Sequence, residues 1–167
     1  AGLSAAYILA RAGWEVTVFE KEPAPGGVVR RAIPGFRVSD GAVSRDISLC
    51  RALGVQFELG REIRSLGELQ GYDATVLAVG APKPAWLPLA YGQAVDALAF
   101  LAACKAGETM RPGGSVAVVG GGNTAVDAAR AALRCPGVER VSLVYRRTRR
   151  WMPAAEEELE AALREGV

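Results

Sequence analysis

Short apolar runs alternate with amphipathic segments along this chain, a pattern typical of parallel α/β folds. Apolar residues recur at helical spacing over residues 1–13, and a strand is predicted directly afterwards at 15–19. The same alternation continues towards the C-terminus. The expected helices cover 1–13, 41–53, 96–104, a segment that begins at 123 and a segment through 156–163, and the expected strands cover 15–19, 55–59, 73–81, 116–119 and 141–145.

The most informative run joins the predicted strand at 116–119 to the helix after it. Gly120, Gly122 and Ala125 occupy the small-residue positions of the G-x-G-x-x-G/A dinucleotide fingerprint. The first glycine permits a tight turn, the second lets a pyrophosphate approach the backbone, and the small third residue lets helix and strand pack closely. The N–H groups at the start of the helix then face the anion. The sequence therefore predicts a nucleotide cofactor.

Basic residues follow the next predicted strand. The strand at 141–145 ends in Arg146 and Arg147, at the position where an NAD site carries an acid for the ribose 2′-hydroxyl. A guanidinium group suits a 2′-phosphate instead, because it can form two parallel N–H bonds to phosphate oxygens. The pattern favours NADP(H) over NAD(H). The alternative is a solvated basic loop formed together with Arg149 and Arg150.

The N-terminal segment predicts the second half of another dinucleotide-binding unit. Gly2 fits the third fingerprint glycine, and Glu20, directly after the strand at 15–19, fits the ribose-binding acid. The first strand and the first two glycines would precede Ala1, and a further strand would follow Val167, so we expect a piece of a longer protein. The alternative is a chance helix–strand pair with an ordinary surface glutamate.

These patterns predict an α/β fold with two Rossmann-like three-layer units in tandem, both incomplete. Pro82, Pro84 and Pro88 make a stiff segment between them. We place the two domains at residues 1–84 and 85–167.

Composition excludes several classes of function. The chain has 167 residues, of which 50% are hydrophobic, enough for the core of one domain or two small ones. A net charge of +2 argues against nucleic-acid binding, and no apolar run is long enough to cross a membrane. Cys50, Cys104 and Cys135 are widely separated, which favours reduced thiols and a cytoplasmic location. The chain has no histidine, so it cannot itself hold a His-based triad or a His-ligated metal.

Three motifs in order carry a family resemblance. They are Glu20-Lys21 with Gly26-Gly27-Val28 and Ile33-Pro34-Gly35-Phe36-Arg37; Gly120-Gly121-Gly122-Asn123-Thr124-Ala125 with Asp127 and Arg130; and Tyr145-Arg146-Arg147 with Met152-Pro153-Ala154 and Glu156-Glu157. Over essentially its whole length the chain resembles the FAD- and NADPH-binding flavoproteins typified by the glutamate synthase small subunit. The nucleotide-binding part of dihydropyrimidine dehydrogenase and the large subunit of the bifurcating NADH-dependent ferredoxin–NADP oxidoreductase belong with them.

The resemblance implies that residues 1–84 bind FAD and residues 85–167 bind NADP(H). For FAD it implies that Glu20 holds the adenosine ribose, Gly27 and Val28 pass beside the pyrophosphate and ribityl chain, Arg37 contacts the flavin side, Ile63 presents backbone groups to the adenine, and Gly80 lines the pyrophosphate. For NADPH it implies that Gly121, Gly122, Asn123 and Thr124 cradle the pyrophosphate and that Arg146 and Arg147 bind the 2′-phosphate.

The activity implied by the resemblance is transfer of a hydride from NADPH to FAD. Electrons would then pass to an iron–sulfur centre or partner subunit, with the cluster in missing parts of the protein or in the partner. We expect no catalytic side chain and no metal ligand in this chain, because the hydride moves directly between cofactors. The isolated chain is expected to be inactive.

Other functions are compatible with parts of this pattern. A non-catalytic nucleotide-binding or subunit-docking module is the main alternative. A flavin monooxygenase is disfavoured by the motifs at 33–37 and 152–154, and a disulfide reductase is disfavoured by the absence of a Cys-x4-Cys pair.

Overall fold

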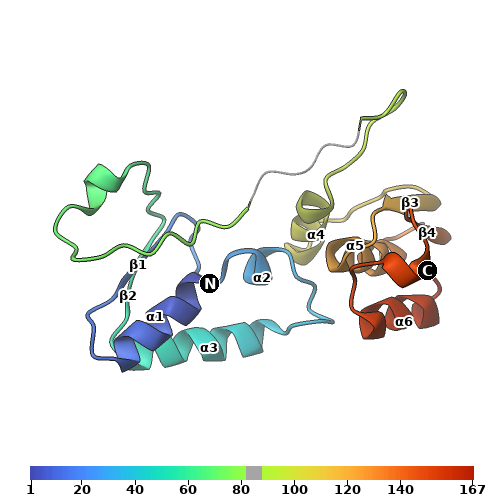
Figure 1. Ribbon diagram of the computed structural model, residues 1–167. Helices are drawn as coiled ribbons and strands as arrows, with labels where there is room; N and C mark the ends of the chain where they lie inside the picture. The colour runs from blue at the N-terminus through green and yellow to red at the C-terminus, as the bar shows by residue number, and fades with distance from the viewer. Residues whose placement is uncertain (82–87) are drawn as a thin grey trace. The chain divides into compact units, whose positions relative to one another are not determined.

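The computed structural model describes residues 1–81 and 88–167, which form two compact units (Figure 1). One unit comprises Ala1–Arg30 and Val38–Lys83, and the other comprises Arg31–Arg37 and Pro84–Val167. The chain therefore enters the second unit briefly at Arg31, long before the predicted boundary. Pro82 and Pro84 of that boundary lie outside the described residues.

The first unit is built on two parallel strands, β1 (Thr17–Glu20) and β2 (Gln56–Leu59). The helices α1 (Gly2–Arg11) and α3 (Asp40–Ala52) pack together in this unit, with Ala6 and Cys50 in its core. Ser39 is the N-cap of α3, and its hydroxyl accepts a 3.2 Å hydrogen bond from the amide of Ala42. A short helix, α2 (Gly27–Arg31), was not predicted.

The strand predicted at 73–81 is wrong. These residues form no strand, and Val76, Leu77 and Val79 are 59%, 70% and 85% exposed. Among the described residues of this unit, the sheet consists of β1 and β2 alone. An apolar run becomes a buried parallel strand only when a neighbouring strand pairs with it and its faces are covered, and the described part of the unit supplies neither.

The second unit contains a βαβ element, in which β3 (Ser115–Val119) and β4 (Arg140–Val144) pair in parallel on either side of α5 (Asn123–Leu133) in the sequence. The helices α4 (Ala97–Lys105) and α6 (Glu156–Glu165) pack against α5 (Figure 1). The alanines of α5 form its packing surface, because Ala125, Ala128, Ala129 and Ala132 are all at most 8% exposed. The described residues also form two short 3₁₀ turns, η1 (Leu66–Leu69) in the first unit and η2 (Arg149–Trp151) in the second.

The three cysteines are free thiols, as predicted. Within residues 1–81 and 88–167, none of the helices combines the length and the apolar character that crossing a membrane requires.

Candidate nucleotide-binding sites

The glycine turn of the second unit stands where the sequence predicts it, between the end of β3 and the start of α5. Gly122 is the N-cap of α5, and it has no side chain to satisfy the first amides of the helix. The carbonyl of Gly122 accepts hydrogen bonds from the amides of Ala125 and Val126, at 2.9 and 3.1 Å. The amides of Asn123 and Thr124 precede these and belong to the group that an α-helix leaves without an internal acceptor. This end of α5 therefore has the polarity that attracts an anion.

The end of β4 is tied to the same turn. The amide of Gly120 donates a 2.9 Å hydrogen bond to the carbonyl of Val144. Arg146 and Arg147 follow within three residues of that carbonyl, and both are exposed. In the described part of the chain neither arginine forms an ion pair. Two cations that pair with no carboxylate of residues 1–81 and 88–167 thus follow β4 beside the glycine turn.

The third sequence motif meets the second at this turn. The side-chain oxygen of Asn123 accepts a 2.9 Å hydrogen bond from the amide of Ala155, the residue that begins α6. The amide of Ala154 donates to the carbonyl of Gly121 at 3.0 Å. Asn123 is therefore engaged in holding the 152–155 segment against the turn, a role that its sequence position did not reveal.

The glycines of this turn differ in how much space a side chain would have. A Cβ added to Gly121 would lie 2.6 and 2.7 Å from ring carbons of Tyr145, and one added to Gly120, whose φ is +152°, would lie 2.9 Å from the Cβ of Ala125. A Cβ on Gly122 would meet nothing closer than Pro153 at 4.0 Å. Gly120 and Gly121 are thus required by the fold, whereas the space beside Gly122 is open and is the cradle that a ligand could fill.

The candidate FAD residues lie in the first unit, with the exception of Arg37. Glu20 ends β1, and its carboxylate accepts a 3.0 Å hydrogen bond from the amide of Glu22. Gly27 begins α2 with a φ of +57°, and no atom lies within 4 Å of an added Cβ, so the backbone is open there. Gly2 lies close to the 73–81 segment, because its added Cβ would be 3.2 Å from that of Ala78, two residues before Gly80. The role of Gly2 as a third fingerprint glycine stays a prediction.

The remaining FAD predictions are not brought together by any described contact. Val28 is 38% exposed on α2, and Ile63 lies in the irregular segment after β2. Arg37 belongs to the second unit, where it forms ion pairs with Asp127 and Glu158 at 3.2 and 3.1 Å. Its contact with FAD, like those of the other residues, stays a prediction.

Sequence reasoning missed a network of charged side chains on α5. Asp127 and Arg130 are 0% and 8% exposed, although they could equally have been surface residues of the helix. Both residues point to partners from other elements, and Arg130 holds Glu158 and Glu165 of α6 at 2.9 and 2.8 Å. The available signal was their position on a helix that is otherwise lined with alanines, where a charge is costly unless it is paired.

The parallel βαβ element and the glycine turn at the start of α5 define an α/β unit of the dinucleotide-binding class. A family model for pyridine nucleotide-disulphide oxidoreductases matches residues 1–167. The chain belongs to this family, and the resemblance noted in the sequence is confirmed.

Known relatives extend the match over the whole chain. YgfK of Escherichia coli K12 is 46% identical, the beta subunit of the NADP(+)-dependent formate dehydrogenase of Moorella thermoacetica is 39% identical, and the NADPH-dependent glutamate synthase small chain of E. coli K12 is 30% identical. Each match covers 100% of this chain, but only 17%, 25% and 39% of the respective relative. The chain thus spans less than half the length of these relatives.

A solved complex of 2-naphthoyl-CoA reductase shares the fold. It superposes with a TM-score of 0.69 over 98% of this chain and 24% of its own, at 18% sequence identity. The likeness supports the α/β architecture, with its parallel strand pairs.

Proposed function

We propose that the second unit binds NADPH, with the pyrophosphate at the turn from Gly120 to Thr124 and the 2′-phosphate at Arg146 and Arg147. The observation that carries this proposal is the hydrogen bond from Gly120 to Val144, because it sets the end of β4 beside the start of α5. The open space at Gly122 lets a pyrophosphate approach the backbone, and the amides at the start of α5 attract its charge. Two exposed guanidinium groups then distinguish a 2′-phosphate from a 2′-hydroxyl.

We further propose that the first unit binds FAD through Glu20, Gly27 and neighbouring residues, and that the whole protein is an NADPH-dependent flavoprotein oxidoreductase. The two cofactors supply the hydride transfer, and electrons leave towards an iron–sulfur centre or a partner subunit. The side chains of this chain bind and orient the cofactors. Two relatives are named for this nucleotide, the NADP(+)-dependent formate dehydrogenase subunit and the NADPH-dependent glutamate synthase small chain, which supports the choice of NADPH.

The test is a comparison of the two nicotinamide cofactors in the full-length protein reconstituted with FAD. Charged hydrogen bonds contribute about 1.5–3 kcal/mol each, so replacing both arginines (Arg146→Ala with Arg147→Ala) should raise the KM for NADPH by about 100-fold or more. The KM for NADH should change by less than about threefold. Arg149→Ala with Arg150→Ala is the control, because it removes two arginines from the neighbouring 3₁₀ turn η2, where Arg149 already pairs with Glu156. Equal effects of the first double variant on both nucleotides would contradict the proposal.

A further inference from the structure

Residues 31–37 belong to the second unit, although the residues before and after them in the sequence belong to the first. Ala32 is 1% exposed and packs in a buried cluster with Leu101 of α4 and Ala128 of α5. The ammonium group of Lys105 donates a 2.7 Å hydrogen bond to the carbonyl of Ile33. The segment is therefore fixed at its start by an apolar contact and a charged hydrogen bond, which is more than an ordinary surface loop receives.

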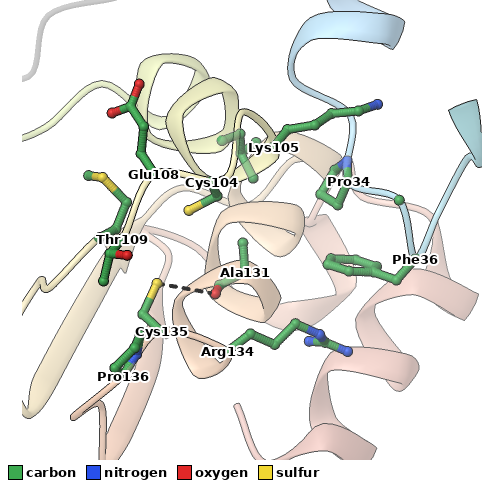
Figure 2. Close-up of a pocket in the computed structure, with 13 residues that line it drawn as sticks. Pro34, Phe36, Cys104, Lys105, Glu108, Thr109, Ala131, Arg134, Cys135 and Pro136 are labelled. Atoms are coloured by element: carbon green, nitrogen blue, oxygen red, sulfur yellow. Dashed lines mark hydrogen bonds between the residues drawn. The ribbon is translucent and has the colours of Figure 1, made fainter.

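Phe36 adds an aromatic contact. The guanidinium carbons of Arg130 and Arg134 lie 4.3 and 4.4 Å from the centre of its ring. Contacts of this kind between cations and aromatic rings are attractive, more so when they are partly withdrawn from water. Phe36 and Arg134 line a pocket of about 350 Å³. Figure 2 shows the two side chains next to each other, with Pro34 close by.

Arg37 completes the attachment. Its Nη1 donates to both carboxylate oxygens of Asp127, at 3.3 and 3.2 Å, and its Nε lies 3.1 Å from Oε1 of Glu158. The side chain of Asp127 is 1% exposed. Burial raises the pKa of Asp127, and the charge of Arg37 opposes this rise. A carboxylate so far from water needs a cation beside it to stay ionised, and Arg37 supplies that cation from a different part of the chain.

We propose that Arg37 is a positioning residue, which anchors residues 31–37 on α5 through Asp127 and so restrains the preceding glycine turn at Gly26–Gly27. Gly27 is a proposed FAD contact, and α5 begins at the proposed NADPH turn, so the anchor would link the two cofactor sites through a short stretch of chain. For its effect on hydride transfer this inference rests on the proposed function. It gives Arg37 a role other than direct contact with the flavin.

The test measures the anchor and the chemistry separately in the full-length protein. Hydrogen exchange of the amides at residues 31–37 reports whether the segment stays attached, and it needs no cofactor. Arg37→Met removes the cation and keeps much of the side-chain volume, Arg37→Lys keeps the charge without the planar fork, and Arg45→Met on α3 is the control. We expect exchange at 31–37 to accelerate at least about tenfold in Arg37→Met, less in Arg37→Lys, and not at all in the control.

The chemistry is read by stopped-flow reduction of the bound flavin with saturating NADPH. We expect Arg37→Met to slow this step at least about fivefold while the KM for NADPH and the FAD content stay within twofold. Unchanged exchange at 31–37 in Arg37→Met would overturn the anchor. Loss of FAD with protection intact would assign Arg37 to the flavin and would also overturn it. If NADPH fails to reduce the flavin of the unaltered protein, the proposed function fails, and the exchange result still decides whether the anchor exists.

Discussion

Glu165 is the residue at which the charged network of the second unit can be tested most directly. Its carboxylate accepts hydrogen bonds from Nε and Nη2 of Arg130, at 3.0 and 2.8 Å, and from both terminal nitrogens of Arg134, at 2.8 and 3.1 Å. Hydrogen bonds from these two arginines, with the larger effect from Arg130, lower the pKa of Glu165 from its ordinary value of 4.5 to about 2. Glu165→Gln keeps the size of the side chain and removes the charge that causes this shift.

The size of the effect follows from the pKa. A shift from 4.5 to about 2 corresponds to about 3 kcal/mol. The side chain is 28% exposed, so solvent screens part of this energy, and we expect Glu165→Gln to lower the free energy of unfolding by about 1–2 kcal/mol at pH 7. Because the pKa is lower in the folded state, this contribution is complete above the ordinary pKa of 4.5 and disappears as the pH falls towards 2.

The assay is urea unfolding followed by circular dichroism at pH 7 and pH 3. The difference between the unaltered protein and Glu165→Gln should fall at pH 3 to less than about half of its value at pH 7. Glu15→Gln, which removes an exposed carboxylate outside the network, serves as the control and should change stability by less than about 0.5 kcal/mol at either pH. A Glu165→Gln effect no larger than that of the control, or the same at both pH values, would refute the reasoning.

Three further predictions concern the glycine turn, the FAD site and the half-buried thiol of Cys104. Gly121→Ala should lower the free energy of unfolding by about 1–3 kcal/mol in thermal unfolding, because its Cβ would meet the ring of Tyr145 at 2.6 Å. Gly122→Ala should fold normally and weaken NADPH binding at least about tenfold in a titration. Normal NADPH binding by Gly122→Ala would argue against the proposed cradle. Glu20→Gln should lower the FAD affinity about tenfold in equilibrium titrations, because a carboxylate accepts the ribose hydroxyls as a charged group, and an unchanged affinity would remove Glu20 from the site. Burial raises the pKa of Cys104 to about 11. Its rate of alkylation by iodoacetamide, measured by peptide mass spectrometry, should therefore be low at pH 7.5 and rise about tenfold per pH unit up to about pH 10. A rate that levels off near pH 8.5 would contradict this.

Local signals in the sequence were sufficient for most helices and for the glycine turn. Helices were predicted from residues 41 and 96, and at these starts Ser39 and Asp96 each accept a hydrogen bond from an amide of the first turn. The run from Val116 to Ala125 was correctly placed at a junction between strand and helix, since small residues at fixed spacing act within a few residues of each other.

The sequence could not decide features that depend on distant partners. The run at 73–81 has the composition of a strand, but strand formation requires a neighbour that pairs with it, and composition carries no information about that neighbour. The same limit explains the short helix α2 and the attachment of residues 31–37 to α5. Arg37 and Asp127 lie 90 positions apart in the chain, so no local pattern links them.

The arginines of this unit show why burial is needed to separate structure from binding. Arg37, Arg130 and Arg134 contact the carboxylates of Asp127, Glu158 and Glu165, so three positive charges meet three negative ones. Removing one of these six groups would leave its partner as a partly desolvated charge, so the network is costly to break. Because the charges neutralise one another, the network offers little net charge to a ligand. Arg146 and Arg147 are exposed and have no ion pair within the described residues, so their charge remains available to an incoming phosphate. In the sequence all five are simply arginines near nucleotide motifs; the carboxylates that neutralise three of them single out the other two as the candidates for recognising NADPH.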